Sequence, residues 1–110
     1  MAGKFEVYKD KAGEFRFRLK AGNGEVILTG EGYAGKSGVT NGIKSVRENA
    51  VKPERFEKKE TKSGKPFFVL KAGNSQVIGQ SGMYSSASAC DKGIASVAKN
   101  APDATVDDQA

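Results

Sequence analysis

The sequence predicts an α+β fold built from two tandem repeats, each of three strands and a helix, that share one core. The first observation is an internal repeat, because the segment KAGNGEVI at residues 20–27 returns as KAGNSQVI at residues 71–78. The match extends without a gap, and such a repeat fixes the architecture before single residues are assigned. The other two observations are strict alternation before the repeated segment and an apolar stripe of helical spacing after it.

The length of the chain favours a single domain. A protein of 110 residues buries roughly 65% of its unfolded surface, whereas one repeat alone would be marginal. We therefore assign residues 1–110 to one domain made of repeats 5–50 and 56–101. The connector at 51–55 is too short for a flexible linker, and an acidic tail follows at 102–110.

Three strands precede the helix in each repeat. Residues 5–8 alternate, and turn residues at 10–13 separate them from the next strand. That strand, FRFRLK at 15–20, alternates strictly, so that its Phe and Leu residues face one side and its Arg and Lys residues the other. Such a pattern is typical of a half-buried antiparallel strand. A third strand follows the turn at 21–24.

The turn at residues 21–24 needs backbone positions that tolerate a positive φ. The second repeat has Ser75 in place of Gly24, and Ser is poorly suited to positive φ. The Gly-Asn pair that both repeats share, at residues 22–23 and 73–74, is therefore predicted to occupy the positive-φ positions.

A helix is predicted from about residue 36 to 49 and again from 87 to 100, because apolar residues recur there on one face. These residues are Val39, Ile43, Val46 and Ala50 in the first repeat and Cys90, Ile94, Val97 and Ala101 in the second. We expect Ile43 and Ile94 to be almost fully buried and Cys90 to be a packed residue. Gly42 and Gly93 cost ~1 kcal/mol each relative to Ala, which indicates a close approach between helix and sheet.

The residue inventory argues against catalysis. The chain has no His and one Cys, so it lacks the commonest proton shuttle at neutral pH and any Cys/His catalytic pair or metal site. The acidic residues are scattered. We expect a protein that is not an enzyme, with no catalytic, cofactor-binding or metal-binding residue and no cofactor. A small enzyme that works without His is the least favoured alternative.

The charge and the apolar pattern bear on partners and location. A net charge of +5 can attract phosphate-rich partners, although the lysine-rich surface of an ordinary soluble protein is the favoured explanation. No apolar run approaches the ~18 residues of a membrane span, and a single Cys suits a reducing compartment. We expect a cytoplasmic monomer without membrane contact.

The doubled motif KAGNxxVI, the Tyr six residues after it and the closing GIxSVxxN resemble the YegP-like family of small bacterial tandem-repeat proteins. The resemblance implies a single antiparallel sheet with two helices on one face and pseudo-twofold symmetry. It also implies that the C-terminal strand of each repeat, about Glu54–Phe56 and Thr105–Asp107, is exchanged onto the other repeat. The resemblance assigns no catalytic or binding residue to this chain.

The repeats agree on the predicted core face of the second strand but disagree on its open face, where packing does not dictate the residue. The candidate binding surface on this open face is Arg16, Arg18, Lys20, Phe67, Val69 and Lys71. We expect a binding or adaptor module that acts through this open face, for which a protein is one possible partner. The alternative is a binder of nucleic acid or another anionic polymer that uses Arg16, Arg18 and Lys20, and a terminus that covers Phe67 and Val69 would explain the apolar pair without a partner.

Overall fold

The computed structural model describes residues 3–110. The described chain forms seven strands, two α-helices and one 3-10 helix: β1 (Lys4–Lys9), β2 (Phe15–Lys20), β3 (Val26–Gly30), α1 (Lys36–Asn49), the 3-10 helix (Pro53–Arg55), β4 (Phe56–Glu60), β5 (Pro66–Lys71), β6 (Val77–Gln80), α2 (Ala87–Asn100) and β7 (Thr105–Asp108). None of the helices in residues 3–110 has the length and apolarity that a membrane span requires.

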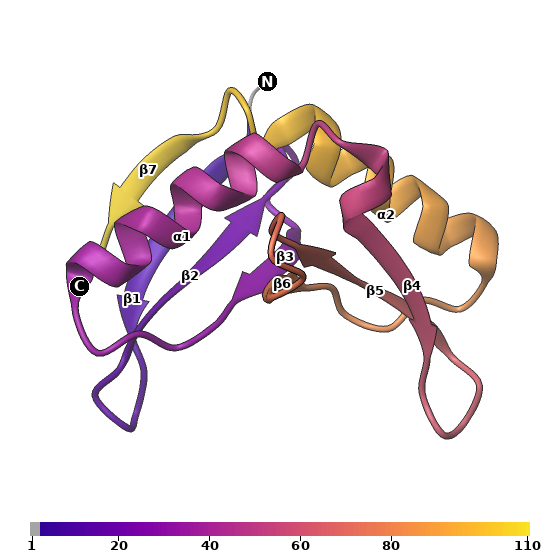
Figure 1. Ribbon diagram of the computed structural model, residues 1–110, viewed down its shortest axis with the longest axis horizontal. Coiled ribbons are helices and arrows are strands. Elements are labelled where there is room, and N and C mark those ends of the chain that lie inside the picture. Colours follow the sequence, from indigo (N-terminus) through magenta and orange to yellow (C-terminus); the bar gives the residue numbers. More distant parts are fainter. Residues whose placement is uncertain (1–2) are drawn as a thin grey trace.

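One sheet runs through both repeats in the order β4-β5-β6-β3-β2-β1-β7. β3 and β6 join the repeats through two residue pairs, Thr29–Gln80 and Gly30–Gly79, so a pseudo-twofold axis passes between these strands. Both helices cover one face of the sheet (Figure 1). The β1–β2 and β4–β5 hairpins project from the sheet on either side, downward in the same view. The α+β fold with two helices on one face is confirmed.

The core is continuous across the repeat axis. The alternating strand residues Phe17, Leu19, Phe68 and Leu70 are fully buried, and Cys90 is packed among them as predicted. Helix α1 lies over β2 and reaches β5 and β6, while α2 lies over β5 and reaches β3. Neither repeat therefore encloses its own apolar residues, which is why one copy would be marginal by itself.

The mid-helix glycines make room for a tyrosine. A Cβ atom at Gly42 would lie 2.6 Å from the hydroxyl oxygen of Tyr33, and one at Gly93 would overlap Tyr84 in the same way. The predicted close approach is confirmed, and its immediate partner is the tyrosine ring rather than the sheet backbone. Each tyrosine thus lies beneath the helix of its own repeat.

The turn residues differ from the prediction. The positive φ falls on Gly24 (87°) and on Ser75 (69°), and not on the Gly-Asn pairs that precede them. Gly24 N donates to the carbonyl of Ala21 at 2.9 Å, and Ser75 N donates to Ala72 at 2.9 Å. Each turn is therefore followed by one left-handed residue, a common three-residue hairpin connection. Both repeats adopt the left-handed conformation at the same place in the turn, even where that residue is Ser.

The exchanged strand occurs only once. β7 of the second repeat pairs with β1 of the first in parallel, so the sheet is mixed rather than purely antiparallel. The predicted counterpart, Glu54–Phe56, is wrong, because Pro53–Arg55 form the 3-10 helix and Phe56 begins β4. The chain enters β4 directly from the connector. The connector between α1 and β4 is too short to form a strand beside β4 and then return to the start of β4.

The single exchange also makes the two helices unequal. Ile43 is 6% exposed, whereas Ile94 is only half-buried, so the prediction of equal burial is wrong for Ile94. Ile43 and Val106 of β7 line the same hollow beside α1. In the described part of the chain no strand lies at the equivalent place beside α2.

Candidate functional site on the open sheet face

All six candidate residues lie on the face of the sheet turned away from the helices. Arg16, Arg18 and Lys20 alternate along β2 with residues buried beneath the helices, as Phe67, Val69 and Lys71 do along β5. Two strands, β3 and β6, separate the two sets, which corresponds to roughly 14 Å along the sheet. The structure thus brings the candidates onto one face in two groups, one on each side of the repeat axis.

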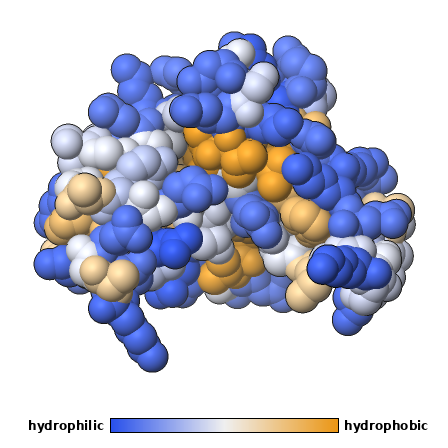
Figure 2. Space-filling view, turned by 60° about the horizontal axis from the view of Figure 1, so that its bottom comes forward, coloured by the Kyte–Doolittle hydropathy of each residue, from blue (hydrophilic) through white to orange (hydrophobic). Residues whose placement is uncertain are grey.

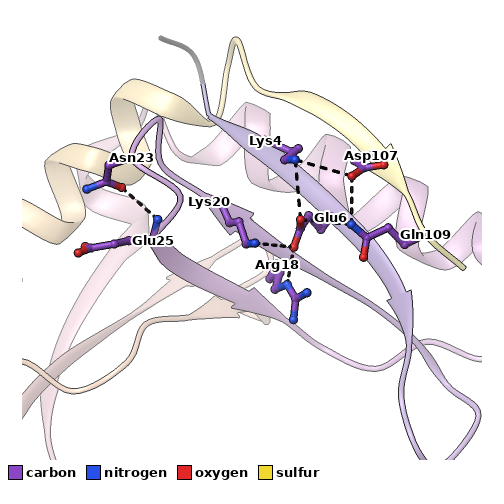
Figure 3. A network of polar contacts seen from close by, with 8 residues as sticks. All are labelled: Lys4, Glu6, Arg18, Lys20, Asn23, Glu25, Asp107 and Gln109. Carbon is purple, nitrogen blue, oxygen red and sulfur yellow. Dashed lines mark hydrogen bonds and ion pairs between the residues drawn. The ribbon is translucent and has the colours of Figure 1, made fainter.

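The basic group is organised around a carboxylate that the sequence analysis did not single out. Glu6 on β1 is 4% exposed and lies opposite Arg18. Its Oε1 atom is 2.7 Å from Arg18 Nε and 3.1 Å from Lys20 Nζ, and its Oε2 atom accepts a hydrogen bond from Gln109 at 3.2 Å. The Nζ atom of Lys4 lies 3.9 Å from the Oε2 atom of Glu6, so that three cationic side chains surround this carboxylate (Figure 3).

These contacts keep Glu6 ionised. The hydrogen bond from Arg18 lowers the pKa of Glu6, burial opposes it, and Lys20 adds to the lowering, so that the pKa falls from 4.5 to about 2. A carboxylate at this place neutralises charge on the basic stripe. Arg18 and Lys20 are therefore less available to an external anion than their sequence pattern indicates.

The side chain of Arg16 extends toward the end of β3, away from the Glu6 network. Its guanidinium group is 3.8 Å from Asp10 and donates to the carbonyl of Gly30 at 3.1 Å. Arg16 also lines a hollow of about 320 Å³ at the ends of β3 and β6. The other lining residues are Thr29, Gly30, Glu31, Gln80, Ser81 and Gly82. This hollow is polar and takes residues from both repeats.

The apolar group of the second repeat offers less surface than predicted. Phe67 is half-buried, and Val69 is 3% exposed. Within residues 3–110 neither end of the chain covers them, because β1 and the tail that pairs with it lie at the opposite end of the sheet. The cross-strand neighbours of Val69 on this face are Glu57 and Gln80, and Glu57 also forms an ion pair with Lys71. Of the apolar pair, only Phe67 keeps accessible surface.

Two valines add apolar surface that the sequence analysis assigned only to a strand. Val26 is 48% exposed and pairs with Lys20, and Val77 is half-buried and pairs with Lys71. Since paired residues share a face, both valines lie on the open face. When the underside in Figure 1 is turned toward the viewer, apolar residues gather between the two hairpins, whose own surfaces are hydrophilic (Figure 2). The sequence signal for this apolar surface is the valine that both repeats carry at the same place, Val26 and Val77.

The site holds no evident reactive group. Within residues 3–110, no three His, Cys, Asp or Glu side chains lie close enough together to hold a metal ion. Cys90 is buried, and burial raises the pKa of its thiol. A protonated thiol is a poor nucleophile, so Cys90 acts in packing.

Comparison with known proteins identifies relatives along nearly the whole chain. A family model described as a domain of unknown function (DUF1508) matches residues 10–57 and again residues 61–108. A UPF0339 protein in the ptx operon 5' region of Stutzerimonas stutzeri is 57% identical over 106 residues, which is 96% of each chain. The UPF0339 protein YegP of Escherichia coli K12 is 52% identical over 108 residues, which is 98% of each chain.

Two solution NMR structures have the same fold. The UPF0339 protein SO3888 from Shewanella oneidensis superimposes with a TM-score of 0.91 at 52% identity, covering 98% of this chain and 92% of its own. The yegP protein of unknown function from E. coli superimposes with a TM-score of 0.94 at 51% identity, covering 99% of this chain and 94% of its own. The likeness therefore extends over both repeats.

Proposed function

The chain belongs to the YegP-like (UPF0339) family of tandem DUF1508 repeats, and we propose that it is a non-enzymatic binding module that recognises a protein partner through its open sheet face. One observation carries the proposal. The repeats match on the buried face but differ on the open face, where Arg16 and Arg18 stand at the places of Phe67 and Val69. Packing explains the agreement, and a single asymmetric partner explains the difference.

The chemistry of the face supports a partner that presents both apolar and polar groups. Half-buried Phe67 and exposed Val26 offer apolar contact, and the hollow beside Arg16 offers hydrogen-bond donors and acceptors from both repeats. A protein surface that presents an apolar side chain to one repeat and an oxygen acceptor to the other fits this arrangement. Such a mixture of apolar, polar and Arg contacts is common at protein interfaces.

The alternative function, binding of nucleic acid or another anionic polymer, has weaker support from the geometry. The net charge of +5 favours it. However, Arg18 and Lys20 already contact the nearly buried Glu6, and Arg16 is close to Asp10. A phosphate would have to compete with these carboxylates for the same donors.

Affinity capture from a native bacterial lysate, with and without nuclease, tests the proposal. We expect a protein to be captured in both lysates and lost with a Phe67→Ser, Arg16→Gln double variant. The matched control is Val51→Ser with Lys44→Gln, because these exposed residues lie in the connector and on the helix layer. Equal capture by the site variant and the control would refute the open face as the site.

The same experiment distinguishes the anionic-polymer alternative. Binding that disappears after nuclease treatment, and that falls steeply as the salt concentration rises, would indicate a nucleic-acid partner. Capture that persists in nuclease-treated lysate and moderate salt indicates a protein partner.

A further inference from the structure

We propose that the outer edge of β4 binds an extended acidic segment of another protein, which adds to the sheet as an eighth strand parallel to β4. β1 and β4 occupy equivalent places in the two repeats. β7 covers the outer edge of β1, while in residues 3–110 no strand pairs with the outer edge of β4. The chain thus displays the filled form of a site at one end of the sheet and the open form at the other.

The filled form shows how the backbone of an added strand is held. Thr105 N donates to the carbonyl of Gly3 at 3.2 Å, and Gln109 N donates to the carbonyl of Val7 at 2.7 Å. The residue at the place of Val7 in the second repeat is Lys58. Because β4 pairs with β5 on its other side, the carbonyl of Phe56 and both backbone groups of Lys58 are directed outward and can form the same ladder. The N–H of Phe56 already donates to the carbonyl of Pro53.

The side-chain environment of the open form also has room for a strand. A hollow of about 230 Å³ lies between β4 and α2, and its lining includes Lys58, Ala87 and Cys90. Val7, Lys36 and Val39 are the corresponding residues of the hollow that Val106 lines at the other end of the sheet. An apolar side chain at the place of Val106 would therefore cover Ile94, which is only half-buried.

The register of β7 on β1 predicts the sequence of the segment. Val106 is opposite Phe5, and Asp108 is opposite Val7. Transferred to β4, the segment has an apolar residue opposite Phe56, an uncharged one opposite Glu57, and acids opposite Lys58 and Lys59. Lys58 also forms an ion pair with Asp91 of α2, so Lys59 is the main cation for the segment. At the filled end Asp108 is 3.1 Å from Lys36 of α1. Ala87 takes the place of Lys36 in the second repeat, so at the open end the cation comes from β4 itself.

The charge of the edge also explains why a foreign segment fits better than a second copy of this chain. Two β4 edges side by side would bring their own lysines together, and inward-pointing charges on an edge strand disfavour such self-pairing. The tail of a second copy would place Asp107 opposite Glu57, and that tail is already paired with its own β1.

A synthetic peptide, Ac-Ala-Thr-Val-Thr-Asp-Asp-Ala-NH2, tests the proposal by NMR titration of the full chain. We expect chemical-shift changes at residues 56–60 and on the facing side of α2, with slower hydrogen exchange at the amide of Lys58. A peptide with Lys-Lys in place of Asp-Asp should not bind. Lys59→Glu should weaken binding by about threefold to fivefold, whereas Lys62→Glu at the hairpin tip should have little effect.

Backbone methylation provides the control for strand addition. An N-methyl group on the second Thr of the peptide removes a donor that faces β4 and should abolish binding, while one on the first Asp faces away and should be tolerated. Equal effects of the two methyl groups would overturn the proposal. Shifts confined to β1 and β7 would also overturn it, as would concentration-dependent dimerisation through β4 in the absence of peptide.

Discussion

Replacing the nearly buried Glu6 by Gln should remove the centre of the ion-pair network without changing the shape of the side chain. The pKa of Glu6 is lowered from 4.5 to about 2, and each pH unit corresponds to about 1.4 kcal/mol, so the network contributes about 3 kcal/mol at neutral pH. The side chains of Arg18 and Lys20 are 35% and 26% exposed. Because water screens such groups, we expect Glu6→Gln to lower the free energy of unfolding at pH 7 by about 2–3 kcal/mol.

The pH dependence supplies the decisive measurement. A carboxyl whose pKa is depressed in the folded state stabilises the protein fully above its unfolded pKa, and the stabilisation is lost as the pH falls toward the folded pKa. The difference between wild type and Glu6→Gln in urea unfolding should therefore be full at pH 7 and shrink between pH 4.5 and about 2. A difference that is absent at pH 7, or unchanged at pH 2, would refute the reasoning.

The second repeat provides a matched control for this experiment. Glu57 occupies the place of Glu6, but its side chain is 45% exposed at the edge of the sheet and contacts Lys71. We expect Glu57→Gln to have a much smaller effect on unfolding at pH 7. An equally large loss would mean that burial of Glu6 is not the source of its contribution.

Three further predictions concern the fold. Ser75→Gly should stabilise the protein by about 0.5–1 kcal/mol in urea unfolding, because Gly relieves the strain of the positive φ at some cost in chain entropy. Gly24→Ser should destabilise the protein by a similar amount. Changes of the opposite sign would contradict the turn geometry. Ile43→Ala should cost about 2–5 kcal/mol and Ile94→Ala about 1–2 kcal/mol, and equal losses would mean that β7 does not protect Ile43. Residues 1–52 alone should show no cooperative melting by circular dichroism, whereas a folded monomeric fragment would contradict the shared core.

The repeat and its periodicities were sufficient to predict the layers of the fold. Alternation in FRFRLK and the stripe through Ile43 depend only on neighbours along the chain, so they indicate which side is buried without knowledge of the partner strand. The aligned glycines indicated a crowded helix. The tyrosine responsible for the crowding lies several residues away on a loop, and its ring position depends on the packed structure.

The charge network was harder to predict because it depends on cross-strand neighbours. Glu6 becomes nearly buried only where β1 pairs with β2, which brings Arg18 and Lys20 to the same carboxylate. The single strand exchange, in contrast, was open to prediction. The first repeat leads into Phe56 after a short connector, whereas the second is followed by a free tail that can reach β1.

The parallel pairing of β1 with β7 has a mechanical consequence. The chain enters the fold at the start of β1 and leaves it at the end of β7, and the two strands run in the same direction through four residue pairs, from Lys4–Thr105 to Val7–Asp108. Tension applied to the two ends pulls these strands past each other in shear. The evenly spaced hydrogen bonds of a parallel pair then bear the force together instead of opening one after another. The strand that links the second repeat to the first is thus also the element that resists extension of the whole chain.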